Sequence, residues 1–224
     1  MPRVVAKRIT RFRKLVRAYA VRGLRRFPWR SRTTPYRVLV SELMLQRTGA
    51  AQVARVYGTF LRRFPTLRRA SRASAGELAR VLRPLGRVAR YRIVVRAFAH
   101  LVVERAGRVP NQLKDLLCIP AVGPYTARAV LCFAYGRPVG LIDPGIYRVL
   151  GRVFGITSDK NRFHTDPKLW QFVDRLVPRV EAREFNYALL DIAATLCLKR
   201  GPKCVECPLV SICLFAKGRL RVAA

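Results

Sequence analysis

Apolar residues recur at helical spacing along almost the whole chain, and this periodicity predicts an all-α fold. Near the start of the chain, Ile9, Phe12, Leu15 and Val16 would share one helical face, with arginine and lysine between them. No stretch alternates apolar and polar residues as a half-buried strand would. Proline and glycine interrupt the pattern repeatedly. Further helices are predicted near 36–46, 50–63, 74–83, 88–105, 112–118, 124–135, 143–154, 167–177 and 184–196.

The charge of the chain is strongly one-sided. Forty-five lysines and arginines face 12 acids, for a formal net charge of +33. Nucleic acid is the partner that this charge favours, because cations bound to phosphates release counterions. An anionic membrane surface is the weaker alternative, because the apolar residues are not confined to one amphipathic helix. A composition that is 51% hydrophobic excludes a disordered chain, and we expect neither a transmembrane helix nor a secretory signal.

Four of the six cysteines crowd into one short segment, at the spacing C-x6-C-x2-C-x5-C. They are Cys197, Cys204, Cys207 and Cys213. Four thiolates in one loop can hold zinc or an iron–sulfur cluster, whereas unlinked free thiols seldom gather in this way. Zinc sites usually pair two C-x2-C units, and the single unit here favours a cluster. The other two cysteines, Cys118 and Cys132, are expected in the core.

A second motif reads as helix, tight turn and helix over residues 117–127. The turn consists of Pro120, Ala121, Val122 and Gly123. Its backbone amides, together with the N-terminus of the second helix, could bind a phosphate oxygen. An ordinary turn between helices is the alternative interpretation.

Two carboxylates lie in apolar surroundings. Glu42 is the one acid in residues 38–45, so burial there would raise its pKa. Asp143 follows the apolar segment 139–142 and precedes Pro144, where a helix would begin. Both also have ordinary interpretations, Glu42 as a satisfied helical acid and Asp143 as a helix N-cap.

Taken in order, these motifs resemble the helix-hairpin-helix (HhH-GPD) DNA glycosylases of the endonuclease III and MutY superfamily. The resemblance runs from about Phe27 to Cys213 and includes Pro28-Trp29-Arg30. It implies a two-lobed fold: a six-helix lobe over 27–137 that holds Glu42 and the hairpin, and a terminal lobe of 1–26 and 138–224. The terminal lobe would hold Asp143 and a [4Fe-4S] cluster in the loop 197–213. DNA would enter a groove between the lobes.

Position 125 indicates the subfamily. Bifunctional relatives carry a lysine there that attacks C1′, whereas this chain carries Tyr125, so no imine and little or no AP lyase activity is expected. MutY-type adenine glycosylases carry serine, and the glycosylases that remove T or U opposite G carry tyrosine. The chain also stops 11 residues after Cys213, without room for the C-terminal domain of the full-length adenine enzymes. We therefore expect a monofunctional glycosylase of base excision repair that hydrolyses the N-glycosidic bond of T or U mispaired with G.

Two alternatives stay open at this point. One is an adenine glycosylase that acts on A opposite G or 8-oxoguanine without the C-terminal domain. The other is a non-catalytic, cluster-bearing DNA-binding protein. The expected setting is the cytoplasm of a prokaryote, in association with the nucleoid, where the protein would act as a monomer on double-stranded DNA that contains a mismatch or a damaged base.

The resemblance also implies roles for single residues. Asp143 would stabilise the sugar cation, Glu42 would hydrogen-bond the departing base or position water, and Tyr125 would form a wall of the pocket for the flipped base. Two departures from the family pattern are Ala121, where the hairpin commonly has glycine, and Gly145, where asparagine or histidine is common. Expected DNA contacts are the hairpin turn 120–123, the loop of Gln46, Arg47 and Thr48, the loop of Arg87 and Val88, and Lys199, Arg200 and Lys203 in the cysteine loop.

Overall fold

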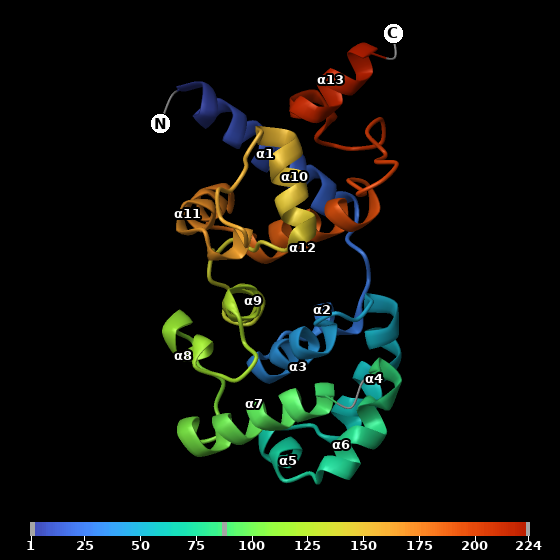
Figure 1. Cartoon of the computed structure of the whole chain (residues 1–224), viewed down its shortest axis with the longest axis vertical. Helices are drawn as coiled ribbons and strands as arrows, with labels where there is room; N and C mark the ends of the chain where they lie inside the picture. Colours follow the sequence, from blue (N-terminus) through green and yellow to red (C-terminus); the bar gives the residue numbers. More distant parts are fainter. Residues whose placement is uncertain (1–2, 87–88, 223–224) are drawn as a thin grey trace. The chain divides into compact units, whose positions relative to one another are not determined.

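The computed structural model describes residues 3–86 and 89–222, and every regular element in these ranges is a helix (Figure 1). The expectation of an all-α fold is confirmed. By its internal contacts the chain divides into a central unit, Arg26–Tyr135, and a terminal unit, Met1–Arg25 with Gly136–Ala224. The boundaries expected from the sequence, 27 and 137, lie within two residues of these. In the described part of the chain, no helix is long and apolar enough to cross a membrane.

The central unit is built around two helices that are buried along most of their length. Residues 38–44 of α3 and 126–133 of α9 are buried without interruption, and the two helices pack together. This agrees with their sequences, in which apolar residues predominate, although the buried stretches also contain Ser41, Glu42, Thr126 and Arg128. Eight α-helical segments occupy the described part of this unit, rather than the six expected, because the two short helices α2 and α5 were not expected. They are α2 (Pro28–Ser31), α3 (Pro35–Leu45), α4 (Ala50–Arg63), α5 (Leu67–Ser71), α6 (Ala75–Leu82), α7 (Ala89–Arg105), α8 (Leu113–Leu117) and α9 (Pro124–Phe133), with the 3₁₀ turn η1 (Arg83–Leu85) after α6.

The terminal unit joins the two ends of the chain. Helix α1 packs on α12, and α10 packs on both α12 and α13. The ring of Phe12 on α1 lies 5.1 Å from that of Phe154 and 6.2 Å from that of Phe185. These aromatic contacts fasten the N-terminal helix to segments more than 140 residues away. The helices are α1 (Arg3–Arg22), α10 (Pro144–Phe154), α11 (Pro167–Leu176), α12 (Ala182–Thr195) and α13 (Leu214–Val222), with the 3₁₀ turns η2 (Phe163–Thr165) and η3 (Val210–Ile212).

The segment that leads into α10 is held tightly against α11. The N–H of Gly140 donates to Asp174 Oδ1 at 2.8 Å. A Cβ at Gly140 would lie 2.4 Å from Val173 Cγ1, so only glycine permits this close approach. Leu141 and Ile142, which follow, are buried. The start of α10 is therefore positioned by its packing on the core of the terminal unit.

Candidate active site and cysteine cavity

Asp143 stands at the N-terminus of α10, as its N-cap residue. Its Oδ1 accepts a hydrogen bond from the N–H of Ile146 at 2.6 Å, and the side chain is half-buried. Burial raises the pKa of the Asp143 carboxyl, while the backbone N–H groups of Ile146 and Gly145 and the charge of Arg148 act in the opposite direction. Asp143 is thus the N-cap residue of α10, which is the ordinary interpretation offered from the sequence. It is also a carboxylate in surroundings of low polarity.

Two arginines on α10 connect this helix to the cysteine segment. Arg148 donates to the carbonyl oxygens of Cys197 at 2.7 Å and Ala193 at 2.9 Å. Arg152 donates from Nη1 to Leu198 O at 2.7 Å and lies 3.4 Å from Cys197 Sγ. Neither arginine was predicted as a site residue from the sequence. Their spacing of four residues, which places both on one face of a helix that begins at Asp143, is the signal that could have found them.

Glu42 and Tyr125 belong to the central unit, whereas Asp143 belongs to the terminal unit. Glu42 is only 5% exposed, within the buried stretch of α3. Tyr125 is half-buried in the first turn of α9, directly after the hairpin. Because α3 packs on α9, these two residues lie on neighbouring helices of one unit.

The hairpin joins α8 to α9 through a turn whose residues differ in their surroundings. Ala121 is exposed and has a φ of +64°, in the left-handed region where glycine is favoured. The N–H of Val122 donates to Ile119 O at 3.0 Å, and its side chain is buried, so Val122 anchors the turn in the core. Gly123 is exposed as the N-cap residue of α9, and Pro120 is half-buried. The turn therefore places its surface at positions 121 and 123.

The loop after α3 lies against this hairpin. Gln46 donates from Nε2 to the carbonyl oxygen of Ala121 at 2.9 Å. Arg47 is exposed and has a positive φ of 57°, and Thr48 is half-buried. The structure thus brings together two of the segments expected to contact DNA. Arg87 and Val88, expected in a second such loop, lie outside the described residues.

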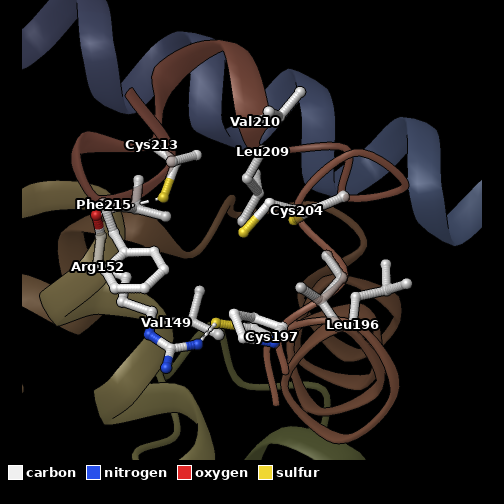
Figure 2. A pocket seen from close by; sticks show the side chains of 14 residues that line it. Val149, Arg152, Leu196, Cys197, Cys204, Leu209, Val210, Cys213 and Phe215 are labelled. Atoms are coloured by element: carbon white, nitrogen blue, oxygen red, sulfur yellow. Dashed lines mark hydrogen bonds between the residues drawn. The ribbon is translucent and has the colours of Figure 1, made fainter. Parts of the chain in front are cut away.

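Four cysteines line a single cavity of the terminal unit. Figure 2 shows the side chains of Cys197, Cys204 and Cys213 directed into the space, and Cys207 also lines it. The apolar walls include Val149, Leu196 and Leu209, and the space that no atom fills, open solvent included, is about 360 Å³. Within residues 3–86 and 89–222, no three His, Cys, Asp or Glu side chains converge closely enough to hold a single metal ion. The thiols therefore surround a space rather than one point.

The chemistry of these thiols follows from their burial and mutual proximity. Burial above all, with a smaller contribution from the neighbouring cysteines, raises the pKa of Cys207 to about 11. Burial also raises the pKa of Cys213, whose Sγ donates to the carbonyl oxygen of Arg152 at 3.3 Å. The protein alone therefore favours protonated thiols here, and a cationic centre in the cavity would favour the thiolates.

The loop between Cys197 and Cys204 is basic and exposed. Lys199, Arg200 and Lys203 all have exposed side chains, and Lys203 forms an ion pair with Glu206 at 3.7 Å. The two remaining cysteines differ from each other. Cys132 is buried in α9 as expected, but Cys118 is exposed at the C-terminal end of α8. The prediction for Cys118 is wrong because α8 buries only one side, through Leu116.

Comparison with known proteins assigns the chain to a family. Residues 40–175, more than half of the chain, match the model of the HhH-GPD superfamily base excision DNA repair proteins. The chain therefore belongs to the HhH-GPD superfamily of base excision DNA repair proteins, and the resemblance stated from its motifs is confirmed.

Two similar proteins, both from archaea, are close in length to the chain. Thymine-DNA glycosylase of Aeropyrum pernix is 40% identical over 91% of the chain and 92% of its own length. Thymine/uracil-DNA glycosylase of Pyrobaculum aerophilum is 40% identical over 95% of both. A solved structure of a thermostable thymine-DNA glycosylase superposes with a TM-score of 0.90, at 30% identity, over 96% of this chain and 99% of its own.

Proposed function

We propose that this protein is a monofunctional DNA glycosylase of base excision repair that removes T or U mispaired with G. The observation that carries the proposal is Tyr125 in the first turn of α9, a helix that contains no lysine. Without an amine at this place, no imine can form at C1′, and hydrolysis is the reaction that remains. The relatives named for thymine and uracil support the choice of base.

In the proposed reaction the bond between C1′ and the pyrimidine nitrogen breaks, and its electron pair leaves with the base. The sugar becomes an oxocarbenium ion, water adds to C1′ with loss of a proton, and an abasic site remains. An ionised Asp143 stabilises the cation and orients the water. The hydrogen bond from Ile146 to Oδ1 holds the carboxylate in one orientation throughout.

Residues of the central unit act on the base in this proposal. A T or U opposite G costs less to extrude than a paired base, which favours its selection. Tyr125 forms a wall of the base pocket, and Glu42 donates to or accepts from the departing base, or positions the water.

Phosphate contacts come from the hairpin turn, at Pro120 and at the exposed positions 121 and 123, and from Arg47, Lys199 and Arg200. The protein works as a monomer on double-stranded DNA of the nucleoid.

We also propose that the four cysteines bind a [4Fe-4S] cluster. A single zinc ion needs all four sulfurs within about 2.3 Å of one point, whereas these thiols surround a cavity without converging closely enough for one ion. Thiolate ligands and apolar walls fit an iron–sulfur cluster. When bound, the cluster would hold the basic loop 198–203 in place. Iron and acid-labile sulfide analysis of the purified protein tests this, and one zinc per chain with no sulfide would refute it.

The function is tested by single-turnover cleavage of labelled duplexes that contain T·G, U·G, A·G or A·8-oxoguanine, with a fully matched duplex as control. Each reaction is divided, and one half is treated with hot alkali, which cleaves abasic sites. We expect cleavage at T and U only after alkali. Cleavage at A alone would contradict the proposed base, and cleavage without alkali would contradict the monofunctional chemistry.

Two variants test the assigned residues. Asp143→Asn is expected to lose base release by at least about 100-fold, within the range for a positioned catalytic group, while it retains affinity for the mismatch duplex. An unchanged rate would refute the role of Asp143. Tyr125→Lys is expected to form an imine that borohydride traps on DNA, and absence of trapping would contradict the placement of position 125 at C1′.

A further inference from the structure

Gly145 is the second residue of α10, two positions after Asp143. Its φ lies outside the left-handed region, so the backbone at this position suits any L-residue. Glycine at a helical position is less favourable than alanine because it loses more backbone freedom on folding. Conformational freedom therefore gives no reason for glycine here, and the reason must be space.

The space around Gly145 is bounded on two sides. A Cβ built at this position would lie 3.0 Å from Ala193 Cβ on α12 and 3.2 Å from Asp143 Oδ1, with Asp143 Oδ2 at 3.6 Å. Ala193 is buried, and its carbonyl oxygen is held by Arg148, so α12 has little freedom to withdraw. The side chain that can give way is the Asp143 carboxylate.

The same glycine also contributes a donor to that carboxylate. The N–H of Ile146 donates to Asp143 Oδ1 at 2.6 Å, and the N–H of Gly145 acts with it to lower the pKa of the carboxyl against the effect of burial. Such donors fix the direction of the carboxylate and favour its ionised form. A carboxylate displaced by a Cβ at 145 would lose part of this donor set.

We propose that Gly145 is a positioning residue for the reaction: the absence of its side chain lets α10 lie against Ala193 while the Asp143 carboxylate keeps its orientation. This inference rests on the proposed function, which assigns the reaction at C1′ to Asp143. Asparagine or histidine, common at this position in the family, would occupy the space that the carboxylate borders in this chain.

The test is Gly145→Ala in the full-length protein, with Gly76→Ala as the matched control. Gly76 is likewise the second residue of a helix, α6, whose N-cap Ser74 accepts from the third residue. Its Cβ would meet nothing closer than Ser74 Oγ at 3.9 Å. We expect Gly145→Ala to lower the single-turnover rate on the preferred mismatch about 10-fold to 100-fold, as displacement of a catalytic group does. Gly76→Ala keeps the rate of the unmodified protein.

A second readout separates positioning from a structural defect. The N–H at position 145 is kept in Gly145→Ala, but a displaced carboxylate lies farther from it and from the N–H of Ile146. The ionised form of Asp143 is then less stabilised, so the acid limb of the pH–rate profile should move to higher pH. The charged group that acts on Asp143 from its own helix, Arg148, is unaltered by the substitution. The packed helix α12 presents Ala193, which does not titrate, at this point. The acid limb of Gly76→Ala should not move.

The double variant Gly145→Ala with Ala193→Gly removes the shorter of the two contacts and should recover part of the lost rate. A rate for Gly145→Ala equal to that of the unmodified protein overturns the proposal. So does a loss of rate with an unmoved acid limb and no recovery in the double variant. Asp143→Asn, measured in parallel, separates the two hypotheses. If it is fully active, the proposed function of Asp143 fails. If it is inactive while Gly145→Ala is normal, only the inference on Gly145 fails.

Discussion

Replacing Gly140 by alanine should destabilise the terminal unit strongly, because the added Cβ has no space. It would lie 2.4 Å from Val173 Cγ1 and 2.8 and 2.9 Å from the backbone carbon and oxygen of Val173. Carbon atoms in contact prefer about 3.5–4.0 Å, so one of the two segments must move by roughly 1 Å. Val173 is completely buried, and rotation of its side chain relieves only the shortest contact.

The magnitude follows from two contributions. Overpacking of a rigid core site costs about 1–3 kcal/mol. The displacement also weakens the bond from the Gly140 N–H to the carboxylate of Asp174 at 2.8 Å, and bonds to charged groups contribute about 1.5–3 kcal/mol. We therefore expect Gly140→Ala to lower the free energy of unfolding by about 3–5 kcal/mol. Asp143 lies three residues further on, so base release should fall as well.

The assay is urea unfolding of Gly140→Ala, Val173→Ala and the double variant. Val173→Ala removes Cγ1 but leaves the two backbone contacts. The double variant should therefore lose less free energy of unfolding than the two single variants lose when their losses are added. Gly218→Ala is the control: it lies exposed in α13 with nothing within 4 Å of its Cβ, and it should gain about 0.5–1 kcal/mol. A Gly140→Ala protein within about 0.5 kcal/mol of the original, the range of ordinary surface changes, would refute the reasoning.

Three further predictions concern single side chains. Ala121→Gly relieves a left-handed residue without loss of a buried contact, so a gain of roughly 0.5–1 kcal/mol is expected in thermal unfolding, and a loss would contradict it. Burial raises the pKa of Asp143 in the folded protein above its value in the unfolded chain. The protonated acid is therefore favoured in the folded state, and stability falls as the pH rises from about 3.9 through the raised pKa. Asp143→Asn, which can still accept from Ile146, should thus be more stable than the original at neutral pH and equal to it below the ordinary carboxyl pKa, as measured by urea unfolding at both. The completely buried carboxylate of Asp191 accepts hydrogen bonds from the backbone N–H of Arg25 at 2.9 Å and from its Nε at 2.6 Å. Asp191→Ala should lower the free energy of unfolding by about 2–3 kcal/mol. A loss of less than half of that would show that the pair contributes little.

Much of the helical framework was predictable because it depends on local pattern. The expected helix 50–63 matches α4, and the helix expected from Asp143 is α10, which Asp143 caps. Burial of Glu42, on which its raised pKa was made to depend, is consistent with the apolar residues that surround it in α3. The short helices α2 and α5 were not predicted, because four or five residues contain too little periodicity. Helix α13 was not predicted either, and no pattern marked it out in the sequence.

The sequence alone determined the all-α class, the superfamily and the identity of the residue at position 125, because each depends on residue order and spacing. Tertiary structure decided which segments meet. Arg148 and Arg152 reach the cysteine loop, Gln46 bonds the hairpin turn, and Cys118 faces outward. The narrow space at Gly145 likewise arises from Ala193, 48 residues away. Such contacts depend on distances between elements remote in sequence, and the packing of whole helices, rather than local preference, sets those distances.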